Sequence, residues 1–287
     1  MAEHAEDFEV IEREAERIAK ELDIPPCPVI LARFNDEFHA QQPDLRRLAA
    51  LIGTDVGLSA TILKTVNSSF YGLVKKATGV EQALSILGLR ACANMISGLL
   101  LRRAFPDGSG PAIERFWDSS MRIAGIAAGI ASRLKEVDRD AAHTYVLFRD
   151  CGMLVMLRKF AQYTEIMEQG ATIRGAQLTR IEDVRFKFNH ARVASALARS
   201  WSLPEALCGA ILHHHEFELM TKKTIESEAA DRKLVAFGLL AEQIAALHAN
   251  QGLCPDWECG ERFVLDTLDI EPDEIVKLTE DLLAAVD

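Results

Sequence analysis

The apolar positions of this chain recur every three or four residues along almost its whole length, which is the period of a helix that buries one face. A charged amphipathic helix is predicted over residues 7–22, and the three prolines within residues 25–28 end it, because proline cannot continue a helix. No alternating run of useful length predicts a strand. The predicted fold class is therefore all-α.

Further short helices are predicted in the first third of the chain. Pro43 opens one that Gly53 is placed to stop, and a second covers residues 58–66. Thr78 and Glu81 have the spacing of a capping box, which predicts the start of a helical stretch that continues to about residue 101. Helices this short are typical of a compact bundle.

The clearest break in the helical pattern is Phe105-Pro106-Asp107-Gly108-Ser109-Gly110-Pro111. Its glycines and prolines interrupt helices, and its polar residues favour turns. We therefore predict a linker at residues 106–111, an N-terminal helical bundle over residues 1–105, and a second helical domain over residues 112–287. The bundle is expected to pack on the second domain.

The second domain is predicted to be helical throughout. Residues 140–160 are apolar almost all round, which indicates one central buried helix. Asn189 can cap a helix that runs through Trp201. The other predicted helices are residues 113–134, 204–215 and 234–247.

The charge balance restricts the classes of partner. The chain has 43 acidic and 32 basic residues, a net charge of -11, which disfavours a broad surface for nucleic-acid phosphates. The pairs Lys75-Lys76 and Arg102-Arg103 are expected to be solvated faces. No apolar run has the length of a membrane span, and the N-terminus is too charged for a secretory segment. A cytoplasmic protein without direct nucleic-acid or membrane contact is expected.

Two further polar groups have ordinary structural interpretations. The six cysteines lack any CxxC spacing and are expected to be free thiols. Cys254 and Cys259 lie near His248, but their spacing is loose and a fourth donor is not evident, so ordinary thiols are favoured over a zinc site. The run Asn67-Ser68-Ser69 is expected to end a helix rather than to form a recognition surface.

Three histidines and one aspartate are the candidate chemical groups. His190 shares a helix face with the apolar Val193 and Leu197, and steps of three and four from Ile211 place His214 and His215 on an inner face. Asp150 lies in the predicted buried helix, where an unpaired carboxylate is costly. The residues alone leave two interpretations open, namely a metal or phosphate site between helices or hydrogen-bonded polar groups of the core.

The order of several motifs resembles the HDOD domain, the degenerate regulatory relative of the HD phosphohydrolases. The similarity covers about residues 20–250, and several motifs in the right order are more specific than one match. The motifs are Asp55-Val56-Gly57-Leu58-Ser59, Ile62-Leu63 with Asn67-Ser68, Val80-Glu81-Gln82-Ala83-Leu84-Ser85-Ile86-Leu87-Gly88, Phe116-Trp117-Asp118-Ser119-Ser120, Phe148-Arg149-Asp150-Cys151-Gly152, His190 with Trp201-Ser202-Leu203-Pro204, Ile211-Leu212-His213-His214-His215-Glu216, and Leu239-Leu240-Ala241-Glu242.

The resemblance also implies where a metal site would be. In active HD enzymes, histidines, the His-Asp pair and a late aspartate bind one or two metal ions that activate water. The resemblance aligns Ser119 with the first histidine of the HD enzymes, Arg149 with the histidine of the His-Asp pair, and Glu242 with the late aspartate. Asp150, His190 and one of His214 or His215 remain. The predicted degenerate site comprises Ser119, Arg149, Asp150, His190, His214, His215 and Glu242.

These departures predict no catalytic metal and no phosphohydrolase activity. A hydroxyl and a permanent cation replace two imidazoles, which removes donors and adds a charge that repels a divalent ion. The fallback is a weakly bound divalent metal at Asp150, His190, His214 and Glu242.

The resemblance thus implies a non-enzymatic bacterial signal-transduction module, of the kind that couples a sensory or two-component input to another protein. Its expected partners are signalling proteins, with a small ligand as a further option. The alternative is a metal-dependent phosphohydrolase that acts on nucleotides or cyclic dinucleotides. A regulator that contacts nucleic acid directly is a third hypothesis, which the net charge disfavours.

Overall fold

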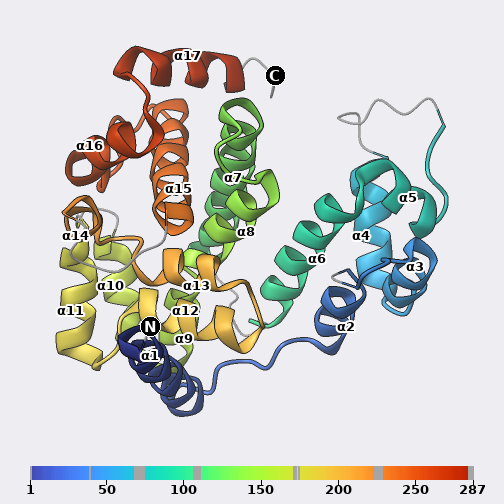
Figure 1. The fold of residues 1–287 in the computed structure, drawn as a ribbon, viewed down its shortest axis with the longest axis horizontal. Coiled ribbons are helices and arrows are strands. Elements are labelled where there is room, and N and C mark those ends of the chain that lie inside the picture. Colours follow the sequence, from blue (N-terminus) through green and yellow to red (C-terminus); the bar gives the residue numbers. More distant parts are fainter. Residues whose placement is uncertain are drawn as a thin grey trace. The chain divides into compact units, whose positions relative to one another are not determined.

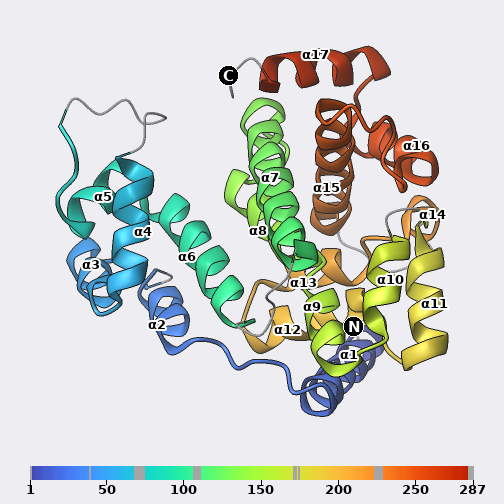
Figure 2. The ribbon, with the colours of Figure 1, turned by 180° about the vertical axis from the view of Figure 1, so that it is seen from behind.

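A computed structural model describes residues 2–38, 40–67, 75–105, 111–170, 173, 175–222 and 229–283. Every regular element in these ranges is a helix, which confirms the predicted all-α class. The chain divides into two compact units, one formed by residues 26–106 and the other by residues 1–25 together with 107–287. Figures 1 and 2 show the helices of both units from opposite sides.

The smaller unit, residues 26–106, is a bundle of short helices around an apolar core. Leu48, Ile52 and Leu84 are fully buried in it. Asp44 and Asp55 begin two of its helices by accepting backbone N–H bonds from the first turn, which satisfies donors that a helix start leaves open. The helices are α2 (Val29–Phe38), α3 (Leu45–Gly53), α4 (Val56–Val66), α5 (Val80–Leu87) and α6 (Leu89–Arg103).

Two local predictions in this unit have different outcomes. The capping box at Thr78 is wrong, because the N-cap of α5 is Gly79 and the Thr78 N–H donates to the side chain of Gln82. Asn67 ends α4 as predicted, and its side-chain amide also forms two hydrogen bonds with the backbone of Ala77, at 2.7 and 2.9 Å. Ser68 and Ser69, and the predicted linker at residues 106–110, lie outside the described residues.

The larger unit consists of helices, several of which are largely buried, such as α8 and α12. Its elements are α1 (Ala2–Glu21), α7 (Pro111–Leu134), α8 (Arg139–Arg149), α9 (Gly152–Lys159), α10 (Tyr163–Gly170), α11 (Ala176–Phe186), α12 (His190–Ser200), α13 (Glu205–Leu212), α14 (Phe217–Thr221), α15 (Ala229–His248), α16 (Trp257–Leu268) and α17 (Pro272–Leu283). The long helices α7 and α15 lie side by side, and α8 packs against both.

The first helix differs from the predicted domain boundaries, which assigned it to the N-terminal bundle. Helix α1 packs on α12 of the larger unit, and Ile18 in α1 and Leu22 just after it are buried. The indole N–H of Trp201 donates to the carbonyl of Pro25 at 3.0 Å. The apolar stripe of α1 is stable only when it is buried against another apolar surface, and α12 provides that surface. Residues 1–25 therefore belong to the same unit as residues 107–287, although residues 26–106 separate them in the sequence.

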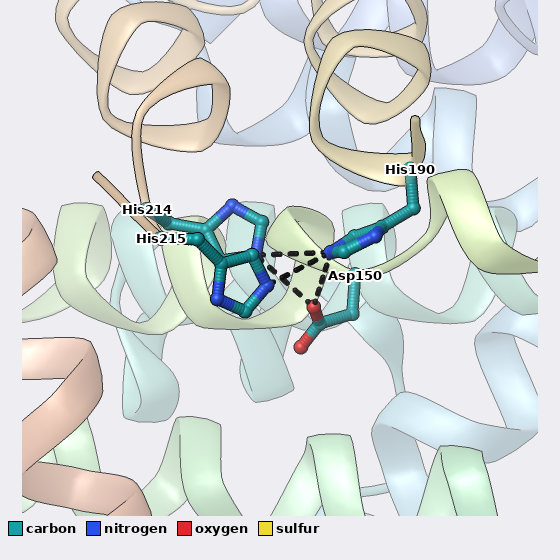
Figure 3. Close-up of side chains that lie close together, drawn as sticks. All are labelled: Asp150, His190, His214 and His215. Atoms are coloured by element: carbon teal, nitrogen blue, oxygen red, sulfur yellow. Dashed lines mark hydrogen bonds and ion pairs between the residues drawn. The ribbon is translucent and has the colours of Figure 1, made fainter. Parts of the chain in front are cut away.

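The single central helix predicted over residues 140–160 is instead two helices, α8 and α9, that meet at Asp150 and Cys151. A Cβ atom added at Gly152 would lie 2.0 Å from the carbonyl oxygen of His190. Helix α9 therefore approaches the start of α12 more closely than any other residue type would allow. The break places Asp150 at the end of α8, facing the start of α12 (Figure 3).

Among the described residues, no single helix is long and apolar enough to cross a membrane. The pair α3 and α4 passes the same test only when joined, and the two helices are bent by 119°.

Candidate metal centre

Four side chains from three places in the chain converge in the larger unit. Asp150 lies in the turn between α8 and α9, His190 is the first residue of α12, and His214 and His215 follow α13. Figure 3 shows the four side chains pointing toward one another. One ligand atom from each lies within 4.8 Å of all the others.

The distances within this cluster are short and regular. Nε2 of His190 lies 3.4 Å from Nε2 of His214 and 3.0 Å from Nε2 of His215. Oδ1 of Asp150 lies 3.3 Å from Nε2 of His214 and 3.7 Å from Nε2 of His190. Donors placed tetrahedrally around Zn²⁺, at bonds of about 2.0–2.1 Å, stand about 3.3 Å apart. The spacing therefore fits a small divalent ion.

Glu182, a fully buried residue of α11, holds His190 in place. Its carboxylate accepts the Nδ1–H of His190 at 2.7 Å and the backbone N–H of the same residue at 2.9 Å. It also accepts the hydroxyl of Tyr163. As predicted, Asn189 caps α12 by accepting the N–H of Arg192. With these contacts, the first turn of α12 aims Nε2 of His190 into the cluster.

The other two imidazoles are held in the same way. Nδ1 of His214 lies 2.7 Å from the carbonyl oxygen of Ile211, which can only accept a hydrogen bond. Nδ1 of His215 donates to Oδ2 of Asp256 at 2.7 Å. The second oxygen of Asp256 accepts the backbone N–H of Gly175 at 2.6 Å.

These partners determine which nitrogen of each imidazole carries the proton. A neutral imidazole has one N–H, and in all three rings the Nδ1–H is donated away from the cluster. Each Nε2 then presents a lone pair to the cluster, together with a carboxylate oxygen of Asp150. A metal ion placed between these atoms would accept all of the lone pairs, in place of the contact between Nε2 of His190 and Nε2 of His215 at 3.0 Å. This is the arrangement by which proteins orient histidine ligands for a metal.

The electrostatics of the cluster suit the same role. Burial lowers the pKa of His214 to about 4, so this ring is neutral at neutral pH. Burial alone would raise the pKa of Asp150, but the nearby guanidinium of Arg149 holds it well below its usual range. Burial likewise opposes the charge of His215, but the hydrogen bond to Asp256 raises its pKa above the ordinary value. The donor set is thus a carboxylate and three imidazoles.

Arg149, 4% exposed, occupies the space beside this cluster. Its Nε lies 3.2 Å from Oδ2 of Asp150, and its Nη2 donates to Glu242 of α15. Burial raises the pKa of Glu242 to about 7, and the nearby charges of Asp150 and Asp256 also raise it. The guanidinium of Arg149 lowers this pKa but does not offset the other effects.

The fallback donor set predicted from the sequence therefore changes in one member. Glu242 forms an ion pair with Arg149 and is not among the four clustered donors, whereas His215 is one of them. From the sequence, the positive charge of Arg149 is predicted to repel a divalent ion. In the structure this guanidinium is ion-paired with Asp150 and Glu242, and the carboxylates of Glu182 and Asp256 contact His190 and His215.

The remaining predicted residues lie elsewhere. Ser119 is exposed on α7, and the metal-capable group found among the described residues does not include it. Nor does that group include Cys254, which is buried, or Cys259 and His248, which are exposed. None of the six cysteines, all of which lie within the described ranges, forms a disulfide bond.

Sequence reasoning missed Glu182 and Asp256. Glu182 had a detectable pattern, because it stands four residues after Leu178 and four before Phe186, on the apolar stripe of a helix. A carboxylate on such a stripe needs a buried partner. Asp256 follows a proline in a connection between helices, and no periodicity marks it.

Comparison with known proteins identifies the fold. The crystal structure of an HDOD domain protein of unknown function from Geobacter sulfurreducens has a TM-score of 0.69 at 22% identity, over 97% of this chain and 95% of that one. A Marinobacter aquaeolei protein provisionally named a signal transduction protein has a TM-score of 0.70 at 19% identity, over 98% of this chain and 63% of that one.

A Treponema pallidum protein, named only as uncharacterized, is 26% identical over 199 residues. The matched region is 67% of this chain and 38% of that protein, so this chain corresponds to a minor part of its relative. Residues 24–217 match the model of the HDOD domain. As the motifs predicted, the chain belongs to the HDOD domain family.

Proposed function

We propose that the protein is a non-enzymatic regulatory module of bacterial signal transduction whose larger unit binds one divalent metal ion, with other signalling proteins as its partners. Membership of the HDOD family supports a regulatory role, and the name of the Marinobacter relative agrees with it. The acidic net charge of -11 supports a protein partner over direct contact with nucleic acid. A cytoplasmic location is part of the proposal.

The observation that carries the metal site is the convergence of three imidazole Nε2 atoms and one carboxylate oxygen, with every Nδ1–H donated elsewhere. Imidazole and carboxylate donors suit Zn²⁺ and similar divalent ions. Asp150, His190, His214 and His215 would hold the ion. When bound, it would link the α8–α9 turn, the start of α12 and the end of α13, which stabilises the folded unit.

The donor count supports binding without hydrolysis. Structural zinc sites are closed by four protein ligands, whereas hydrolytic sites keep one position open for water. Here four protein donors are already present. Arg149 engages Glu242 and the second oxygen of Asp150, so neither group is available to a second ion.

Metal content and binding calorimetry with Zn²⁺ test the site. One ion per chain is expected. His215→Ala should weaken zinc binding by more than about 100-fold, because it removes a ligand, and loss of a ligand's supporting contact alone costs about 10–100-fold. His248→Ala, which changes an exposed histidine at the end of α15, is the matched control and should bind like the wild type. Equal binding by His215→Ala would contradict the site.

Phosphohydrolase activity is the second candidate, and one observation favours it. The side chain of Asp150 is 23% exposed, so the cluster has access to solvent, and an ion with more than four ligands would there retain water. The test is turnover of bis(p-nitrophenyl) phosphate with Mn²⁺ by the full chain. We expect none above the metal-only background. Metal-dependent hydrolysis that disappears in Asp150→Asn would establish the enzymatic alternative.

A further inference from the structure

We infer that helix α11, residues Ala176–Phe186, is coupled to the metal centre, so that occupancy of the ion sets how firmly this helix is docked. The inference rests on the proposed metal site and adds a route from that site to the protein surface. Helices α10 and α11 lie side by side at the margin of the larger unit, away from the long helices α7 and α15 (Figures 1 and 2).

Apolar packing holds α11 only in part. Its buried residues are Leu178, Thr179 and Glu182, and one of these three carries a carboxylate. Phe186 is partly buried and packs its ring on Phe160 and Tyr163. Much of the opposite face is exposed, including Val184 at 86%. The helix therefore depends on polar contacts to a degree that a core helix does not.

The first polar contact joins the middle of α11 to His190. Glu182 is 0% exposed and accepts two hydrogen bonds from His190, through Nδ1 and through the backbone N–H. A buried carboxylate that loses its donors is costly, so the position of the helix and the orientation of the imidazole depend on each other.

The second contact joins the residue before α11 to His215 through Asp256. The backbone N–H of Gly175 and the Nδ1–H of His215 donate to the two oxygens of the same carboxylate, at 2.6 and 2.7 Å. Gly175 has a φ of +50°, a left-handed conformation that favours glycine over other residues. Both the start and the middle of α11 are thus attached to imidazoles of the metal centre.

Removal of the ion must disturb these contacts. Without the ion, Nε2 of His190 and Nε2 of His215 are held only by weaker contacts within the cluster, such as their mutual contact at 3.0 Å, so each ring can rotate and change its bond to Glu182 or Asp256. A bound ion fixes both Nε2 atoms and strengthens both Nδ1–H donors. By linkage, whatever holds α11 in place tightens metal binding by the same factor.

Hydrogen–deuterium exchange of the full chain tests the coupling, with and without Zn²⁺. Zinc should slow exchange in residues 176–186 by about 10-fold or more, the scale on which such supporting contacts affect a metal site. It should slow exchange in α7, which supplies no ligand, by less than 2-fold relative to the same helix without zinc. Protection of α11 no greater than that of α7, with zinc bound, overturns the coupling and leaves the metal site intact. Absence of zinc binding overturns both.

A pair of variants separates coupling from general stabilisation. Glu182→Gln keeps the shape of the side chain but removes its charge, and it should weaken zinc binding by about 10–100-fold and reduce the protection of α11 at saturating zinc. Glu261→Gln makes the same change at an exposed position of α16 and should match the wild type in both measurements. Wild-type zinc binding and α11 protection in Glu182→Gln would overturn the inference.

Discussion

The two units of this chain are both built from short helices, but they bury different kinds of side chain. In the described part of residues 26–106, the only buried polar side chain is that of Ser97. The larger unit buries the ionisable groups of Arg149, Glu182, His190 and His214, among others. The difference shows that the smaller unit is stabilised by apolar packing, whereas the larger one is organised around a charged cluster.

Burial of ionisable groups lowers stability unless each is paired. In the larger unit the pairs are extensive: Glu182 accepts three hydrogen bonds, and Asp256 accepts two. Hydrogen bonds to a charged group require a defined geometry, which apolar contacts do not. The larger unit therefore specifies the positions of individual atoms, which a metal site needs.

The largest expected effect is on the packing of the smaller unit. Leu48→Ala removes a fully buried side chain of α3 and should lower the free energy of unfolding by about 2–5 kcal/mol, measured by urea denaturation. Zinc affinity should stay within 2-fold, because every donor and its partner belongs to the larger unit. A parallel loss of zinc affinity would break the distinction between the units.

The next effect concerns close packing beside the metal centre. Gly152→Ala places a methyl group against the backbone of His190 and should destabilise the protein by about 1–3 kcal/mol while weakening zinc binding. Gly125→Ala is the matched control within α7, where a Cβ meets no atom within 4 Å. It should stabilise the helix by about 0.5–1 kcal/mol. Equal effects of the two variants would show that the approach of α9 to α12 is not tight.

A pH effect of intermediate size should arise in the larger unit, away from the metal centre. Burial, with the charge of Arg139, lowers the pKa of His143 to about 4, below that of an unfolded histidine. The folded state then binds fewer protons, so this contribution to stability is present above pH ~6.5 and is lost as the pH falls toward 4. The loss should be about 1–2 kcal/mol after allowance for partial exposure.

Urea denaturation at pH 7 and pH 5 measures this effect. His143→Gln should reduce the difference in stability between the two pH values. His248→Gln, an exposed histidine, should leave the difference unchanged. A wild-type pH dependence in His143→Gln would assign the effect to other groups.

An effect no larger than this is expected at a polar contact within the smaller unit, between Asn67 and Ala77. Asn67→Ala removes two hydrogen bonds to the backbone of Ala77 and should cost about 1–2 kcal/mol, with no change in zinc binding. Asn67→Asp retains the acceptor for the Ala77 N–H and should lose less. Equal losses in the two variants would indicate that the donor half of the pair contributes nearly all of the stability.

Much of the fold could be predicted from local patterns, and the exceptions are instructive. The helical period and the caps at Asp44, Asp55 and Asn189 depend on residues only a few positions apart. The break at Asp150 was missed, because residues 140–160 are apolar on both sides of it and only contact with α12 requires the bend.

The sequence by itself determined the all-α class, the family, and the inward positions of His190 and His214, since helical periodicity and motif order are properties of neighbouring residues. Only the tertiary structure decided that His215 and not Glu242 joins the cluster, that Glu182 and Asp256 orient the imidazoles, and that α1 belongs to the larger unit. The interacting side chains are far apart in the sequence, from 8 residues for Glu182 and His190 to 93 residues for Arg149 and Glu242. The placement of α1 depends on the fit between its apolar face and a distant helix. Such contacts are selected by the packing of whole helices, which no local pattern records.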